Sequence, residues 1–106
     1  MNQIDIARIQ QDAITSLKNI YDPEIPVNIY DLGLVYEVKV DEQARIHVLM
    51  TLTAPNCPVA ESLPVEVKEQ LSLITGVTDA EVEITFDPPW DRSMISEAAL
   101  LELGLL

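Results

Sequence analysis

The chain of 106 residues is 48% hydrophobic, enough for the core of one small globular domain over residues 1–106 and too apolar for a disordered segment. Its 18 acidic and 6 basic residues give a formal net charge of −12, which argues against nucleic acid and anionic membranes as partners. No N-terminal basic segment precedes an apolar one, and no run approaches the ~18 apolar residues of a membrane span. We therefore expect a soluble, cytoplasmic protein.

The first third of the chain predicts a helix followed by a long irregular loop. Apolar residues recur at helical spacing from Ile6 to Ile20, and the helix should end before Asp22-Pro23. The next stretch, YDPEIPVNIYDLG over 21–33, contains two prolines, each of which lacks an NH and biases its predecessor towards extended geometry. Because ordered loops of this length often carry function, this segment is a candidate part of the site.

Alternating apolar and polar residues predict a β-hairpin over 34–40 and 45–52, joined by the turn 41–44. The expected inward positions are Leu34, Tyr36, Val38, Val40, Ile46, Val48, Met50 and Leu52. His47 falls on the outward register, about 13 Å of strand from Thr51. We interpret it as a solvated surface residue and not as a ligand.

The second half of the chain predicts a helix, a third strand and a terminal helix. Apolar residues at helical spacing over 59–74 predict a helix that ends at Gly76, with Pro64 marking a kink or a second start. The third strand should turn Val82, Ile84 and Phe86 inward.

The segment SEAALLELG then reads as a helix with Ser96 as its N-cap and Gly104 as its stop. The element order α-β-β-α-β-α predicts an α+β fold. We expect a three-stranded mixed sheet with helices packed on one face. The hairpin supplies an antiparallel pair, and the crossover through the second helix makes the third strand parallel to a neighbour.

The single cysteine, Cys57, stands in the stretch TAPNCP and has no second cysteine for a disulfide or a CxxC zinc site. Pro58 suits the first position of a helix, which puts Cys57 at or beside the N-cap. Unpaired NH groups and the helix dipole stabilise a thiolate at such a position. The alternative interpretation is a small buried hydrophobic residue with no chemical role.

Four motifs, DPE, DLGLV, T-x-T-x-P-x-C-P and DPPW, occur in this order and resemble the SufT-like family of small iron-sulfur maturation factors over residues 14–104. That family is related to PaaD-type accessory proteins and to the cytosolic iron-sulfur targeting component of eukaryotes. The resemblance implies these signature positions: Asp22, Pro23, Glu24, Asp31, Gly33, Thr53, Cys57, Pro58, Asp87, Pro88, Pro89 and Trp90. It implies that Cys57 is the functional cysteine. The chain differs from some relatives in having neither a cysteine-rich C-terminal extension nor a nucleotide-binding loop.

Two acidic residues of the first motif have alternative roles. Asp22 and Glu24 are candidate metal ligands near Cys57, or they cap a turn by accepting backbone hydrogen bonds, which we favour. Asp31 opens ordinary Asp-x-Gly turn chemistry and is interpreted as structural support for the site.

The remaining candidates line the expected site. Thr51 and Thr53 lie two apart and so point to the same side, where they line the entrance to the cysteine or simply occupy an exposed strand face. Trp90 is a lid on the core or an exposed contact for a partner, and we favour the core. Pro58 and Asp87 enter the site as signature positions.

The resemblance implies a non-enzymatic factor that delivers or inserts iron-sulfur clusters into client apoproteins, with Cys57 as a reactive or ligating thiolate. The alternatives are a thiol-dependent enzyme acting on a small substrate and a metal-free adaptor for a multisubunit oxygenase or assembly complex. Clusters are commonly held by four protein ligands, so one sulfur predicts a transient cluster that a monomer does not hold stably. Assembly proteins, client apoproteins and a second copy of the chain in a homodimer are the expected partners.

Overall fold

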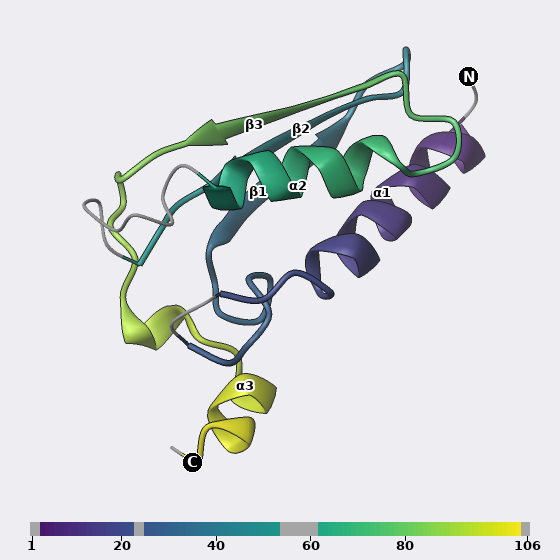
Figure 1. The fold of residues 1–106 in the computed structure, drawn as a ribbon. Helices are drawn as coiled ribbons and strands as arrows, with labels where there is room; N and C mark the ends of the chain where they lie inside the picture. Colours follow the sequence, from purple (N-terminus) through teal and green to yellow (C-terminus); the bar gives the residue numbers. More distant parts are fainter. Residues whose placement is uncertain (1–2, 23–24, 54–61, 105–106) are drawn as a thin grey trace.

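The computed structural model describes residues 3–22, 25–53 and 62–104 and places a three-stranded sheet above two helices (Figure 1). The strands are β1 (Val35–Val40), β2 (Arg45–Met50) and β3 (Asp79–Ile84), in the order β1-β2-β3. β1 is antiparallel to β2, and β3 is parallel to it, with Arg45 opposite Asp79 and Met50 opposite Ile84. The predicted mixed sheet is confirmed, with the apolar strand β2 at its centre.

Two helices, α1 (Gln3–Leu17) and α2 (Ser62–Ser72), cover the same face of this sheet (Figure 1). Each buries a row of apolar side chains at helical spacing: Ile9, Ala13 and Leu17 from α1, and Leu63, Val67 and Leu71 from α2. They join Ile46, Val48 and Met50 of β2 in one hydrophobic core. Pro64 lies in the first described turn of α2, where its missing NH costs little.

The 3₁₀ turn η2 (Arg92–Met94) and the short helix α3 (Glu97–Glu102) lie beyond one end of the sheet (Figure 1). Ser96 caps α3 by accepting a hydrogen bond from the NH of Ala99 at 3.2 Å. Gly104 follows the helix with a φ of +72°, a value that L side chains rarely adopt. The predicted cap and stop of this helix are confirmed.

Two details of the strands differ from the expectation. β2 ends at Met50, and Thr51 is fully buried instead of lying on an exposed strand face. β3 ends at Ile84, so Phe86, expected to point inward, is 45% exposed. Strict alternation holds only while the ladder continues, and both strands leave it at the same end of the sheet.

The loop 21–33 has a buried apolar set of its own, which the sequence analysis did not anticipate. Val27, Ile29 and Leu32 are fully buried. The NH of Ile29 donates to the carbonyl of Ile20 at 2.8 Å, and the NH of Leu34 donates to the carbonyl of Ile29 at 3.1 Å. This loop therefore belongs to the core. Among the described residues, no helix is long and apolar enough to cross a bilayer.

Candidate functional site

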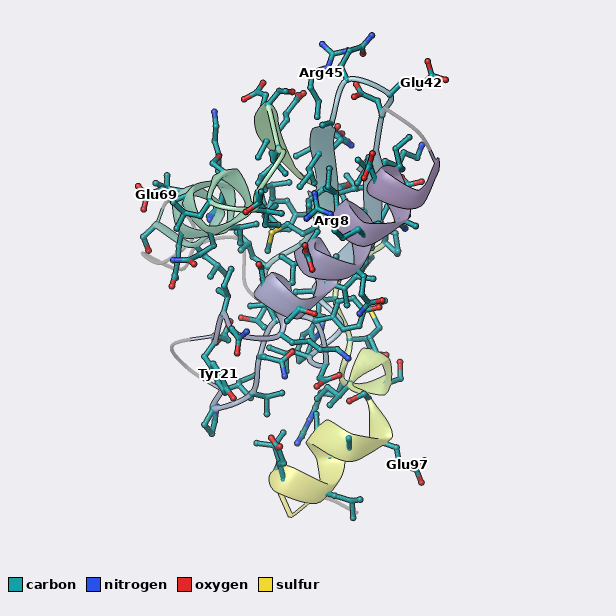
Figure 2. All side chains as sticks on the ribbon, turned by 90° about the vertical axis from the view of Figure 1, so that its right-hand side faces the viewer. Arg8, Tyr21, Glu42, Arg45, Glu69 and Glu97 are labelled. Atoms are coloured by element: carbon teal, nitrogen blue, oxygen red, sulfur yellow. The ribbon has the colours of Figure 1, made fainter. Side chains whose placement is uncertain are left out.

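The topology brings the signature motifs to one end of the sheet, where β1 begins and β2 and β3 end. Residues 21–33 lead into β1, residues 51–53 leave β2, and residues 85–96 leave β3. We call this part of the molecule the loop end. The opposite part, with the turn 41–44 and residues 75–79, is the hairpin end; Figure 2 shows Arg45 and Glu42 there and Tyr21 and Glu97 away from it.

Asp22 stands where the chain enters the loop end, and it is 7% exposed. Its carboxylate oxygen Oδ1 accepts a hydrogen bond from the NH of Ile25 at 3.1 Å. Its own NH donates to the carbonyl of Val27 at 3.2 Å. This is the geometry of a turn cap. Its neighbour in the motif, Glu24, lies outside the described residues, so its role stays a prediction.

Asp31 is held by a reciprocal pair of hydrogen bonds with Asn28. The NH of Asp31 donates to Asn28 Oδ1 at 2.8 Å, and Asn28 Nδ2 donates to Asp31 Oδ2 at 2.9 Å. The carbonyl of Asp31 also accepts the NH of Ser96 at 2.8 Å. Asp31 therefore fixes the loop turn and holds the start of α3 against it, which fits structural support of the site. Sequence reasoning missed Asn28, although an Asn three residues before an Asp-x-Gly turn is a usable signal.

Gly33 allows the segment 85–96 to approach the loop. Its φ is +87°, and a Cβ at this position would overlap the carbonyl oxygen of Met94. Only glycine combines this backbone conformation with so close a contact. The third residue of the DLG motif is therefore required by sterics.

Trp90 lies partly buried against the core and donates from its indole Nε1 to the carbonyl of Leu32 at 2.8 Å. This geometry fits a lid on the core better than an exposed contact. Nearby, the hydroxyl of Tyr36 donates to the carbonyl of Pro88 at 2.8 Å. Asp87 is exposed, and its backbone is paired with the Thr85 hydroxyl. The DPPW motif is thus fastened to both the loop and β1, contacts that its sequence did not reveal.

Thr51 is the most unusual polar residue of the loop end. It is fully buried, its NH donates to the carbonyl of Leu34 at 2.8 Å, and its hydroxyl Oγ1 has no hydrogen-bond partner in the described part of the chain. A buried hydroxyl without a partner typically costs about 1–3 kcal/mol. Thr53, two residues later, is partly buried. Of the two alternatives for Thr51, the exposed strand face is wrong.

Cys57 and Pro58 lie outside the described residues, so the thiolate at a helix start stays a prediction. Within residues 3–22, 25–53 and 62–104, no group of three or more His, Cys, Asp or Glu side chains is placed to hold a metal ion. The described carboxylates of the loop end therefore do not form a metal centre by themselves.

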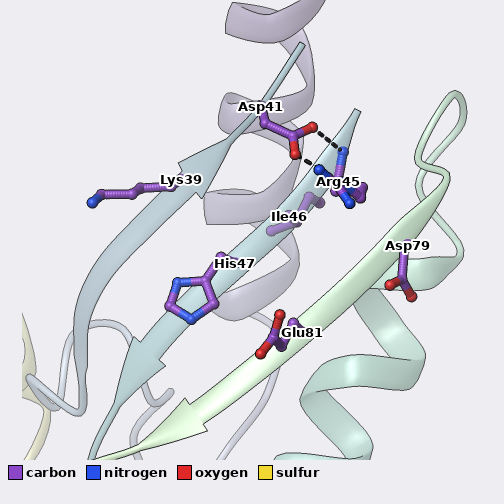
Figure 3. A pocket seen from close by; sticks show the side chains of 7 residues that line it. All are labelled: Lys39, Asp41, Arg45, Ile46, His47, Asp79 and Glu81. Atoms are coloured by element: carbon purple, nitrogen blue, oxygen red, sulfur yellow. Dashed lines mark hydrogen bonds and ion pairs between the residues drawn. The ribbon is translucent and has the colours of Figure 1, made fainter. Parts of the chain in front are cut away.

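The hairpin end carries a shallow hollow of about 400 Å³ lined by Lys39, Asp41, Arg45, Ile46, His47, Asp79 and Glu81 (Figure 3). Asp41 Oδ2 accepts from Arg45 Nε at 2.8 Å, and His47 Nε2 lies 3.1 Å from Glu83 Oε1. Hydrogen bonds hold the pKa of the Asp41 carboxyl below its ordinary value. The largest effect comes from the backbone NH of Arg45, and the Arg45 guanidinium and the backbone NH of Gln43 add to it. These charges satisfy one another, and His47 faces outward as expected.

Fold and loop end together define a class: a small α+β domain that gathers its polar motifs where a three-stranded mixed sheet ends. The chain belongs to the iron-sulfur cluster assembly protein family, whose profile matches residues 10–84. It is 44% identical over 102 residues to the Fe-S protein maturation auxiliary factor of Porphyromonas gingivalis, covering 96% of this chain and 97% of that one. It is 40% identical over 97 residues to the auxiliary factor YitW of Bacillus subtilis, covering 92% and 95%.

Solved structures agree with this assignment. A domain of unknown function from Bacillus anthracis matches with a TM-score of 0.89 at 33% identity, covering 99% of this chain and all of that one. A conserved hypothetical protein from Thermotoga maritima matches with a TM-score of 0.77 at 39% identity, covering 90% and 93%. The resemblance drawn from the four motifs is therefore confirmed, and so is the expected fold.

Proposed function

We propose that this protein is a non-enzymatic maturation factor that passes iron-sulfur clusters to client apoproteins through Cys57 in a cytoplasmic setting. Family membership and the names of its bacterial relatives support the role in cluster maturation. The observation that carries the proposal is the convergence of motifs from distant parts of the sequence on the loop end. Such convergence is expected when several segments build one site on a rigid scaffold.

In the sequence, Cys57 follows Thr53 by four residues and precedes Ser62, the start of α2, by five, which supports placing it at the loop end in this proposal. The buried hydroxyl of Thr51, near the end of β2, has no hydrogen-bond partner among residues 3–22, 25–53 and 62–104. We infer that the loop end is built to receive a polar group from outside the described residues. Asp22, Asp31 and Trp90 hold the surrounding backbone in place.

The transfer we propose is a series of ligand exchanges in which Cys57 takes part in two, while client thiolates replace the remaining donor ligands one at a time. The Cys57 thiolate forms an Fe–S bond to an iron of the cluster while a thiolate of the donor leaves that iron. A client thiolate then forms its own bond to iron, and Cys57 leaves as a thiolate. Each step makes and breaks one iron–sulfur bond, so it needs neither an oxidant nor a reductant. The cluster is the cargo of this exchange.

One sulfur cannot supply the usual set of four cluster ligands. The described residues provide no metal-binding group of their own. The proposal therefore places the other ligands on a donor or client, and the cluster is held only while the two proteins are together. A thiol-dependent enzyme finds less support, because the one histidine lies on β2 beside Glu83, on the outward sheet face.

The test compares client maturation by the wild type, Cys57→Ser and the double variant Cys57→Ser/Ser93→Cys. The double variant keeps one thiol in the chain but moves it to an exposed position on η2. We expect both variants to fold and both to lose maturation, because the thiol must stand at position 57. Full maturation by Cys57→Ser would remove the thiol from the mechanism and favour a metal-free adaptor.

A further inference from the structure

β1 is an edge strand: in the described part of the chain its only strand partner is β2. The NH of Asp41 donates to the carbonyl of Arg45 at 3.0 Å, and the register then places Lys39 opposite His47 and Glu37 opposite Leu49. Hydrogen-bonded pairs alternate along an antiparallel ladder. Lys39 and Glu37 therefore direct their backbone groups to β2, and Val38 and Val40 direct theirs to the open edge.

Two opposite charges flank Val38 on this edge. The side chains of Glu37 and Lys39 are 44% and 67% exposed, and Glu37 Oε1 lies 3.2 Å from Lys39 Nζ. Being two residues apart on a strand, they project from the same face of the sheet, away from the helices. Figure 3 shows Lys39 extending away from β2 and β3.

We propose that a second copy of this chain pairs with this edge, β1 against β1 in antiparallel orientation, about a two-fold axis through Val38. In that register Val38 exchanges backbone hydrogen bonds with Val38 of the second copy. Glu37 faces Lys39 of the second copy, and Lys39 faces its Glu37. These are non-hydrogen-bonded positions, where facing side chains come closest. The symmetry makes both ion pairs identical, as a closed dimer requires.

The second sheet edge does not offer this complementarity. β3 carries Asp79, Glu81 and Glu83 at alternate positions, so an antiparallel copy of it would set acid against acid. A lysine on an open edge usually prevents pairing. On β1, however, Glu37 lies two residues before Lys39. In the register centred on Val38, each Lys39 therefore faces the opposite charge of Glu37 on the second copy. The pattern therefore favours one self-pairing edge and protects the other.

The helix side of the edge is hollowed beside β1. A hollow of about 180 Å³ lies between α1 and β1, lined in part by Gln10, Ile14 and Tyr30. Directly paired residues of antiparallel strands project to the same face, so the second copy's Val38 would stand over this hollow. Each copy carries a net charge of −12, and the pairing involves one short strand. The dimer should therefore be weak and should form only at high protein concentration.

This arrangement has a consequence for the site. The two-fold axis reverses the strand direction, so the two loop ends lie at opposite ends of the continuous sheet. Neither copy then supplies cluster ligands to the other. Each copy keeps its own loop end free for a donor or client.

The test is sedimentation equilibrium of the whole chain over a wide concentration range at fixed ionic strength near ~0.15 M. Lys39→Glu should raise the dimer dissociation constant about tenfold, because both ion pairs become repulsive. The double variant Glu37→Lys/Lys39→Glu restores opposite charges in the same register and should return the constant to near the wild-type value. Lys68→Glu, on the exposed part of α2, changes the net charge as Lys39→Glu does and should have little effect.

A second variant tests the backbone pairing independently of charge. Val38→Pro removes the NH that points to the open edge while leaving the ladder to β2 intact, a position where proline is tolerated. It should abolish the dimer while circular dichroism still shows the fold. A wild type that stays monomeric at all concentrations overturns the proposal. So does a dimer that Lys39→Glu and Val38→Pro both leave unchanged, or one that the charge swap fails to restore.

Discussion

The two ends of the sheet are built in different ways. The hairpin end is held by exposed polar contacts, within the turn between Asp41 and Arg45 at 2.8 Å and across the sequence between Thr78 Oγ1 and the carbonyl of Gln43 at 2.7 Å. The loop end is held by contacts between segments far apart in the sequence, such as Trp90 with Leu32, and by buried apolar residues. Exposed polar contacts add little to the stability of the fold. Contacts across the sequence form only when the whole fold is in place.

This difference bears on our proposal that the loop end carries the function. At the hairpin end Asp41 and Arg45 form a solvent-exposed ion pair. The loop end contains the described residues of the four motifs and a buried threonine hydroxyl with no hydrogen-bond partner in the described part of the chain. If the loop end is both a structural part of the core and the functional end, substitutions there should have larger effects than substitutions at the hairpin end.

The largest effect is expected from Leu32→Ala. Leu32 is fully buried in the loop, so truncation should lower the free energy of unfolding by about 2–5 kcal/mol. Urea denaturation measures this change. Leu101→Ala, at a leucine on α3 that is 60% exposed, is the control and should stay within about 0.5 kcal/mol of the wild type. Equal small losses for both variants would mean that the loop is only a surface connection.

Gly33→Ala should come next, with a loss of about 2–3 kcal/mol, because it adds both a strained φ and an overlap with the backbone of Met94. Gly104→Ala is the matched control. Gly104 also has a positive φ, but a Cβ there would meet nothing within 4 Å, so the loss should be at most about 1 kcal/mol. Similar losses for the two variants, measured by urea denaturation, would show that η2 does not press on the loop.

Trp90→Phe removes the indole NH that donates to the carbonyl of Leu32 but keeps an aromatic ring. The free energy of unfolding should fall by about 1 kcal/mol. Client maturation should fall as well, because the DPPW segment loses a link to the loop. A variant that is destabilised by this amount yet matures clients at the wild-type rate would place Trp90 in the core only.

The smallest effect is expected at the hairpin end, from Asp41→Asn. The folded-state pKa of Asp41 lies below its ordinary value of 3.8, so the ionised carboxylate favours the fold above that pH. This contribution is lost as pH falls through the lowered pKa. Below about pH 4 the wild type should therefore lose thermal stability more steeply than Asp41→Asn, by no more than a few degrees in Tm. Glu42→Gln, next in the turn, is the control. If Tm falls equally with decreasing pH in the wild type, Asp41→Asn and Glu42→Gln, the lowered pKa of Asp41 is contradicted.

The architecture was predictable because its cues are local. Helical spacing places Ile9, Ala13 and Leu17 in the core, and strict alternation places Ile46, Val48 and Met50 there. The N-cap role of Ser96 likewise depends on neighbours within three residues.

The loop end was only partly predictable, because its contacts join distant segments. No residue near Leu32 in the sequence indicates that its carbonyl accepts a hydrogen bond from the indole NH of Trp90. The burial of Thr51 and the exposure of Phe86 both depend on where the ladder stops, which periodicity does not reveal. The motifs therefore pointed to residues whose described members lie at the loop end, but no pattern could say how those residues meet.

The central claim is that one thiolate, Cys57, holds a cluster only in a complex with a donor or client. The most direct test is to measure the molecular mass of the species that carries the cluster. Wild type and Cys57→Ser are each mixed anaerobically with a cluster donor and a client apoprotein, and the visible spectrum is recorded together with light-scattering mass. We expect cluster absorption from this protein only at the mass of a complex with a donor or client, and none for Cys57→Ser. A stable cluster at the mass of the monomer, or a variant complex that keeps its cluster, would contradict a single thiolate that shares its cargo at the loop end.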